Sequence, residues 1–207
     1  MLKMNELYNM DCMEGMKQFP DKYFELAIVD PPYGIGASKM TMGSGKHKFT
    51  KDKEWDWAIP NKSYFNELFR VSKNQIIWGG NYFTEHLPPS KHWVIWDKQN
   101  PNLSFAEGEM AWVNKGKLLR IFKHYSARVE DGGKIHPTQK PVKLYEWLLA
   151  NYAKQGDKIL DTHVGSASSL IACHNYGFDY IGFELDNDYY KAAKERLDAV
   201  KAQLTLF

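Results

Sequence analysis

One short stretch, Asp30-Pro31-Pro32-Tyr33, constrains this chain more than any other. The apolar run in front of it, residues 25–29, is typical of a buried parallel strand. Two consecutive prolines cannot continue a sheet ladder or enter a helix interior, so the chain must turn there. We therefore expect a carboxylate, a rigid turn with exposed carbonyls and an aromatic ring at the carboxyl end of a strand. Open α/β sheets bind their ligands at that end.

A second strand end of the same kind lies far downstream. Residues 156–161 are predicted to form a turn and a strand, followed by a loop of small residues, 162–168, that contains Gly165. A helix is predicted at 168–176, and the strand after it ends in Glu184. A strand, a glycine-bearing turn and a helix N-terminus make up half of a nucleotide-binding unit. An acid about 20 residues after such a loop is suited to binding ribose hydroxyls.

The first turn is suited to the chemistry of an exocyclic amino group on a nucleobase. The lone pair of such an amine is delocalised into the ring, so the nitrogen is a poor nucleophile. The Asp30 carboxylate and the Pro31 carbonyl can both accept its hydrogens, which favours the positive charge that develops on the nitrogen during attack. The Tyr33 ring is suited to stacking on a base taken out of the helix. The alternative is a proline-stiffened turn in which Asp30 only caps a helix.

The Asp-Pro-Pro-Tyr stretch resembles the D/N/S-P-P-Y/F/W signature of the DNA amino-methyltransferases. Residues 136–141, His-Pro-Thr-Gln-Lys-Pro, resemble the H-P-T-x-K-P element that precedes the cofactor strand in that group. The loop after the second strand departs from the usual D-P-F-x-G-S-G-T at Thr162, His163 and Ala167, with a mild change at Ser168. A weaker affinity for the cofactor, or a loop conformation of its own, is compatible with these changes.

The resemblance extends from Asp11 to about Leu197 and implies a fold, a cofactor and a set of residues. The implied fold is the Rossmann-like α/β fold of S-adenosylmethionine-dependent methyltransferases, a mostly parallel twisted sheet with helices on both faces. The implied catalytic residues are Asp30, Pro31, Pro32 and Tyr33. The implied S-adenosylmethionine contacts are Asp11, Cys12, Asp30, Thr138, Lys140, Asp161, His163, Gly165, Ser166, Ser168 and Glu184. Asp11 is equally suited to capping a helix, and Thr138 and Lys140 are expected near the methionine carboxylate.

The catalytic turn precedes the cofactor loop, an order that resembles the permuted β class of this family in a small, phage-like form. The implied activity is site-specific methylation of adenine N6 in double-stranded DNA, by base flipping and direct transfer, as in restriction-modification. S-P-P-Y is commoner in the cytosine N4 enzymes, which remain an alternative. The same chemistry on RNA or on a protein glutamine, and a non-catalytic cofactor- or DNA-binding module, also remain. We expect residues 97–135 to form a short target-recognition insert.

Hydrophobic spacing predicts the remaining elements. The predicted helices are a weak one at 13–19, one at 61–72, one at 141–153 that begins on Pro141, and a last one capped by Asn187. The predicted strands are 75–78, 93–97, 110–113 and 118–122, the last two a pair around the turn 114–116. We expect Trp78, Trp96 and Trp112 in the core rather than in a stacking platform. The polar stretches 37–53 and 124–133 are predicted loops, the first either closing over DNA phosphates or simply solvated.

Composition sets the outer limits of the interpretation. A chain of 207 residues suits one α/β domain, residues 1–207, and a net charge of +2 permits nucleic-acid binding without demonstrating it. Cys12 and Cys173 form no C-x-x-C pair, and we expect a cytoplasmic protein of a bacterial or phage-infected cell. The His and Cys spacing matches no zinc site, so we expect no metal. Residues 203–207, Gln-Leu-Thr-Leu-Phe, resemble a sliding-clamp-binding peptide, with a packed helix end as the alternative. A homodimer is implied by the resemblance alone.

Overall fold

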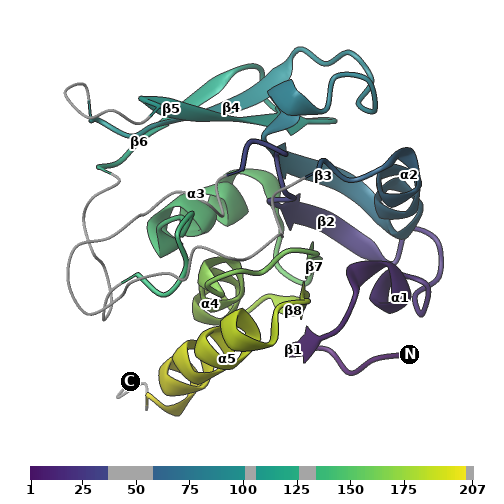
Figure 1. Ribbon diagram of the computed structural model, residues 1–207, viewed down its shortest axis with the longest axis vertical. Coiled ribbons are helices and arrows are strands. Elements are labelled where there is room, and N and C mark those ends of the chain that lie inside the picture. The colour runs from purple at the N-terminus through teal and green to yellow at the C-terminus, as the bar shows by residue number, and fades with distance from the viewer. Residues whose placement is uncertain (37–57, 101–105, 126–133, 204–207) are drawn as a thin grey trace.

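Figure 1 shows the protein, a computed structural model that describes residues 1–36, 58–100, 106–125 and 134–203. Within these ranges the chain folds around an eight-stranded sheet of order β1-β8-β7-β2-β3-β5-β4-β6. The strands are Glu6–Asn9 (β1), Phe24–Val29 (β2), Ser72–Trp78 (β3), His92–Asp97 (β4), Gly108–Val113 (β5), Arg120–Lys123 (β6), Lys158–Asp161 (β7) and Asp179–Glu184 (β8). The α-helices are Cys12–Met16 (α1), Lys62–Val71 (α2), Val142–Tyr152 (α3), Ser168–Asn175 (α4) and Asn187–Ala202 (α5), with a 3-10 helix at Gly80–Tyr82.

Strand pairing is mostly parallel, as the sequence predicts. β1, β8, β7, β2 and β3 pair in parallel one after another, and β6 is parallel to β4. β5 is antiparallel to both of its neighbours, β3 and β4. The prediction that the strands on either side of 114–116 form a pair is wrong, because β4 lies between β5 and β6. The connection 114–119 is long enough to pass the roughly 10 Å width of the extra strand.

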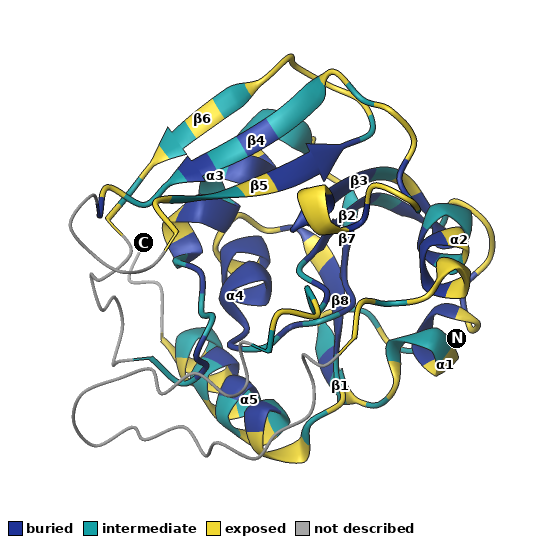
Figure 2. Cartoon of the chain, turned by 45° about the horizontal axis from the view of Figure 1, so that its top comes forward, coloured by how far each residue is buried: buried dark blue, intermediate teal, exposed yellow. Residues whose placement is uncertain are grey.

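Helices cover both faces of the sheet, and β2 shows why its sequence is an unbroken apolar run. Leu26 and Ile28 belong to the core cluster that includes residues of α3, α4 and α5, whereas Ala27 and Val29 pack with residues of α1 and α2. Successive side chains of a strand point to opposite faces, so a strand covered on both sides needs apolar residues at every position. Figure 2 shows the consequence, with buried residues on the strands and on the sides of the helices that face them.

The predicted tryptophan core is confirmed. Trp78 is 0% exposed, Trp96 is 3% and Trp112 is 2%. All three lie on strands with a neighbour on each side, β3, β4 and β5. They therefore stabilise the sheet and are closed to a nucleobase.

Two predicted helix starts are wrong by one residue. Pro141 is the N-cap of α3 in extended backbone rather than its first helical residue. Asp186, not Asn187, caps α5, because its carboxylate accepts hydrogen bonds from the backbone N–H groups of Asp188 and Tyr189. A carboxylate at this position also interacts favourably with the helix dipole, which an amide does not match.

Several sequence predictions fall on residues outside the described ranges. They are the whole of the polar stretch 37–53, most of the loop 124–133, part of the 97–135 insert and the tail after Gln203. Among the described residues, no helix is both long enough and apolar enough to cross a bilayer.

Gly182 marks a point of tight packing between β8 and α4, and it generates a test of the fold. A Cβ at this position would lie 2.5 Å from Val164 Cγ2 and 2.7 Å from Leu170 Cδ1. We expect Gly182→Ala to lower the free energy of unfolding by about 1–3 kcal/mol in urea denaturation, because the added methyl overpacks a buried site. Gly156→Ala is the control for backbone strain alone, since its Cβ would meet open space. Unchanged stability of Gly182→Ala would contradict the close approach.

Candidate active site

The two predicted half-sites lie side by side because the strands that carry them are neighbours. β2 and β7 pair in parallel, with Leu26 opposite Ile159 and Ala27 opposite Leu160. The turn after β2 and the loop after β7 therefore leave the same edge of the sheet. A cavity of about 410 Å³ opens between them, bounded also by the start of α1 and by the loop after β8.

The cavity collects most of the predicted site residues, from segments far apart in the chain. Its lining includes Asp11, Cys12, Asp30, Pro32, Thr138, Lys140, His163, Gly165, Ser166 and Glu184. Four predicted residues, Pro31, Tyr33, Asp161 and Ser168, lie outside that lining. Asp161 and Ser168 act one layer behind the cavity wall, where they hold the loop that forms it.

Asp30 is the polar centre of the catalytic turn. Its Oδ1 accepts a hydrogen bond of 2.6 Å from the Tyr33 hydroxyl, and its Oδ2 lies 2.5 Å from the ammonium of Lys140. Burial raises the pKa of Asp30 above its ordinary value, although the charge of Lys140 opposes that shift. Lys140 itself is 3% exposed, and it pairs with the catalytic turn although the sequence predicts it beside a methionine carboxylate.

Glu109 on β5 extends this cluster and was missed by sequence reasoning. Its Oε2 lies 2.9 Å from Lys140 Nζ, and its Oε1 lies 2.7 Å from the ammonium of Lys98. Burial opposes ionisation of Glu109, but the two lysines outweigh it and hold its pKa at about 2. Trp78 pairs with Ala111, so the antiparallel β5 carries Glu109 beyond the end of β3, to the edge where the Asp30 turn lies.

Tyr33 lies against aromatic rings rather than open to the cavity. Its ring is stacked on Tyr82 with centroids 5.1 Å apart and meets Phe83 edge-on at 6.1 Å. Gly79, at φ +70°, passes so close that a Cβ there would lie 2.2 Å from the Tyr33 ring. These contacts fix the ring beside Asp30, and its stacking on a flipped base stays a prediction.

The loop after β7 is held by hydrogen bonds from behind. Asp161 is buried, and its carboxylate accepts hydrogen bonds from the His163 backbone N–H at 3.0 Å and from the Ser169 hydroxyl. Burial raises the pKa of Asp161 to about 7 despite these donors. Ala167 stands where the family has its second glycine and adopts φ +62°, a left-handed conformation that costs a residue with a Cβ about 1 kcal/mol. Ala167 therefore keeps the backbone conformation that a glycine would adopt, at a cost in strain.

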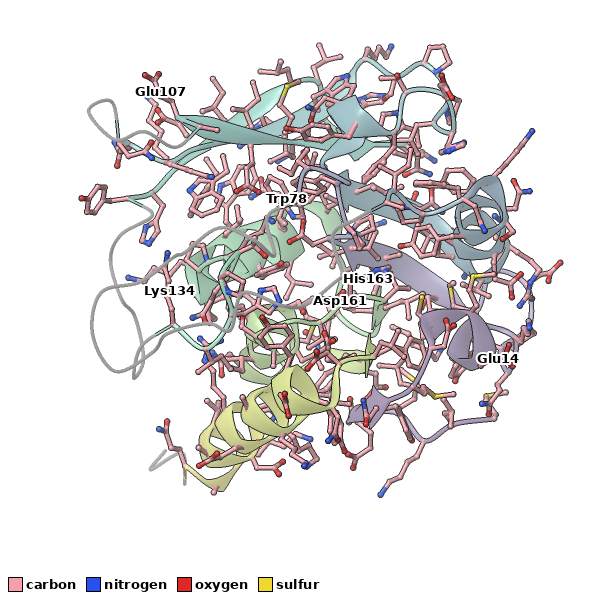
Figure 3. The ribbon with its side chains drawn as sticks, viewed as in Figure 1. Glu14, Trp78, Glu107, Lys134, Asp161 and His163 are labelled. Carbon is pink, nitrogen blue, oxygen red and sulfur yellow. The ribbon has the colours of Figure 1, made fainter. Side chains whose placement is uncertain are left out.

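His163, another departure from the family pattern, lines the cavity as a neutral side chain. Its Nδ1 is hydrogen-bonded at 2.9 Å to the Thr162 hydroxyl, which is in turn 2.7 Å from the hydroxyl of Tyr64 on α2. Burial lowers the pKa of His163 to about 4. Figure 3 shows His163 and Asp161 together near the centre of the molecule, next to the end of β7.

Two acids, Glu184 and Asp11, line the part of the cavity next to the Gly165 loop. Glu184, at the end of β8, accepts a hydrogen bond at Oε2 from the Gly165 N–H (2.8 Å) and at Oε1 from the Asp186 N–H (2.9 Å). These two contacts fix the Glu184 carboxylate at the cavity wall. Asp11 caps α1 by accepting from the Met13 N–H and also lines the cavity, so both of its predicted roles are compatible. Beside it, burial and then the Asp11 charge raise the pKa of Cys12 to about 12, which keeps the thiol protonated.

The cavity lining also includes residues that were not predicted, among them His136, Tyr145 and Tyr189. His136 meets the ring of Tyr189 edge-on with centroids 4.3 Å apart, and a Cβ on Gly165 would lie 3.6 Å from the His136 ring. Tyr145 on α3 also contributes to the wall. His136 belongs to the same six-residue element as Thr138, so the element itself was the available signal. Tyr189 and Tyr145 had none, because each lies on a helix whose apolar face already explains an aromatic residue.

Comparison with known proteins identifies the family. The family described as DNA methylase, of the N6/N4 type, matches residues 77–195, which is more than half of the chain. The type II methyltransferase M.HinfI of Haemophilus influenzae is 25% identical over 252 residues, covering 96% of this chain and 69% of that protein.

Solved structures share the fold. The M1.HpyAVI–SAM complex superposes with a TM-score of 0.64 at 20% identity, covering 93% of this chain and 98% of that one. The PvuII DNA methyltransferase, described as cytosine-N4-specific, gives a TM-score of 0.63 at 14% identity, covering 95% and 89%. The predicted Rossmann-like methyltransferase fold is thus confirmed. Together with the family match over 77–195, the cavity at the ends of β2 and β7 shows that this chain belongs to the N6/N4 DNA methylase family.

Proposed function

We propose that this protein transfers a methyl group from S-adenosylmethionine to the exocyclic N6 of adenine in double-stranded DNA. The observation that carries the proposal is one shared cavity. Asp30 and Pro32 of the catalytic turn line the same cavity as Asp11, Gly165 and Glu184 of the cofactor half. A donor held by the second group lies next to an acceptor held by the first, which is what a direct transfer requires.

The residues present fit the cofactor that this family uses. Asp11 and Glu184 suit the adenine amino group and the ribose hydroxyls, and Gly165 lets the loop pass close to a ligand. S-adenosylmethionine supplies a methyl group activated by a positively charged sulfur. The neutral state of His163 suits the neighbourhood of a cation, because a protonated imidazole would repel it.

On the acceptor side, Asp30 binds and activates the amino group that receives the methyl. Tyr33 and Lys140 use one lone-pair site on each of its oxygens, which leaves further acceptor sites for an amino group. The carboxylate then holds the amino hydrogens and stabilises the positive charge that forms on the nitrogen. The rigid prolines keep the backbone carbonyl beside it from moving away.

We propose adenine rather than cytosine as the target base because the motif begins with aspartate. The fold similarity to a cytosine-N4-specific enzyme keeps N4 methylation of cytosine as the second candidate. Both exocyclic amines need the same acceptor geometry at Asp30. The discrimination between adenine and cytosine therefore depends on which base ring fits the binding site. We also place the chain in the permuted β class, since its catalytic strand, β2, precedes its cofactor strand, β7.

The reaction and its site can be tested together. Wild-type protein is incubated with mixed-sequence duplex DNA and S-adenosylmethionine that carries a labelled methyl group, and the DNA is digested for mass spectrometry of the nucleosides. We expect labelled N6-methyladenine, and a loss of at least about 100-fold in Asp30→Ala, because the developing charge loses its acceptor. Asp179→Asn is the control, an exposed carboxylate at the start of β8.

Three results would change the proposal. N4-methylcytosine in place of N6-methyladenine would keep the mechanism and change the base. Full activity of Asp30→Ala would remove the proposed site. No methyl on DNA, with the cofactor still bound, would point to another substrate or to a non-catalytic module.

The proposed cofactor contacts are tested by measuring the affinity of variants for S-adenosylmethionine. We expect Glu184→Gln to weaken binding of S-adenosylmethionine by about 10- to 100-fold in calorimetry, because an amide cannot both keep the Gly165 and Asp186 contacts and accept two hydroxyls. Glu195→Gln, an exposed change on α5, should leave the affinity as it is. Equal affinities of the two variants would mean that Glu184 does not contact the cofactor.

A further inference from the structure

A row of alternating charges continues from Asp30 into the second half of the sheet. Lys140 lies between two carboxylates, 2.5 Å from Asp30 and 2.9 Å from Glu109, and Glu109 is held on its other side by Lys98 at 2.7 Å. The side chains are shielded, at 17% exposure for Asp30, 2% for Lys140, 20% for Glu109 and 14% for Lys98. The two positive and two negative charges balance.

Four separate segments build this row at one edge of the sheet. Asp30 follows β2, Lys98 follows β4, Glu109 lies on β5 and Lys140 precedes α3. The ring of Trp78 lies 5.4 Å from the Lys140 ammonium and the ring of Tyr33 lies 5.8 Å from it. Aromatic rings and carboxylates therefore take the place of water around Lys140.

Glu109 lies near both groups that form hydrogen bonds with Asp30. The two donors that orient Asp30 are Lys140 and the Tyr33 hydroxyl, and Oε2 of Glu109 lies close to both, at 2.9 Å and 3.4 Å. The Oε2 of Glu109 thus holds the Lys140 ammonium directly, whereas the single hydroxyl proton of Tyr33 is donated to Asp30 and the 3.4 Å contact is secondary. Lys98 in turn fixes Glu109 through its other oxygen.

We propose that Glu109 is a positioning residue for methyl transfer, which acts by holding Lys140 against Asp30. The inference rests on the proposed function. Glu109 is absent from the cavity lining, so it would act through Lys140 rather than by contact with a ligand in the cavity. Glu109 keeps the Lys140 ammonium shared between two carboxylates. The ammonium therefore stabilises the anionic form of Asp30 and leaves other acceptor sites of that carboxylate open. Asp30 then presents its remaining lone pairs to the amino group in one orientation.

The charges that face Glu109 predict how pH should act. They are Lys140 and Lys98, with the Tyr33 hydroxyl, and Lys134 adds a weaker influence from the segment before α3. Burial lowers the pKa of Lys140, but Asp30 and Glu109 outweigh it and hold that pKa above its ordinary value. The negative charge of Glu109 also contributes to the raised pKa of Asp30. Removal of this charge should therefore lower both pKa values.

The test is Glu109→Gln, compared with wild type in the same labelled DNA assay across pH. We expect kcat to fall by about 10- to 100-fold, because a loosely held carboxylate loses its orientation, with an unchanged dissociation constant for S-adenosylmethionine. We expect both limbs of the pH profile of kcat to move to lower pH. Glu107→Gln is the matched control, an exposed glutamate two positions away that Figure 3 shows at the margin of the molecule.

A second variant separates positioning from stability. Glu109→Gln leaves Lys98 without its partner and can unfold the protein. Glu109→Gln combined with Lys98→Gln removes one charge of each sign, and we expect it to show the same loss of kcat and the same pH shift at near-normal stability. A lower kcat with unmoved limbs in both variants would reduce Glu109 to a structural role, and wild-type kcat would overturn the inference outright.

A direct measurement keeps this inference distinct from the proposed function. The pKa of Lys140 can be read from the carbon-13 shift of its Cε, assigned by comparison with Lys140→Arg, in the full protein without DNA. We expect it to fall in Glu109→Gln and to stay in Glu107→Gln. An unmoved Lys140 pKa would contradict the inference even if wild type methylates DNA. If wild type places no methyl on DNA, the proposed function fails while this titration still tests the contact.

Discussion

The parallel pairing of β2 with β7 is the constraint on which the rest of the site depends. It joins residues more than a hundred positions apart, Leu26 with Ile159 and Ala27 with Leu160, and it aligns two strand ends at one edge of the sheet. Each strand is buried on both faces, so a slip in register would carry apolar side chains away from their partners. The Asp30 turn and the Gly165 loop are held at fixed relative positions because the core beneath them cannot shift.

Charge burial is the second organising feature. Burial favours the neutral forms of both Asp30 and Lys140, and the contact between the two opposes that effect in each. The cofactor half shows the opposite solution. There, burial raises the pKa of Asp161 and lowers the pKa of His163, and both side chains form hydrogen bonds with neutral groups. Asp30 thus lies in an ion-pair cluster, whereas the loop after β7 is held by hydrogen bonds.

Local sequence signals predicted the parts of the site that depend on local rules. Two prolines after an apolar run predicted the turn at Asp30, and the glycine-bearing loop followed by Glu184 predicted the cofactor half. Glu109 and Lys98 could not be found in this way, because their role depends on where β5 inserts in the sheet. That insertion is a non-local pairing, Trp78 with Ala111, and the sequence around 114–116 favoured a hairpin instead. Asp186 was missed for a smaller reason, since Asp and Asn are both good caps and only the backbone decides between neighbours.

The central claim is that one cavity serves both the methyl donor and the acceptor amine. The most direct test is a crystal structure of the protein with sinefungin, an analogue of S-adenosylmethionine in which a carbon bearing an amine replaces the sulfur bearing the methyl group. The account predicts its ribose at Glu184, its adenine near Asp11 and the amine that replaces the methyl group directed toward Asp30. Sinefungin bound elsewhere, or bound with that amine turned away from the Asp30 turn, would contradict it.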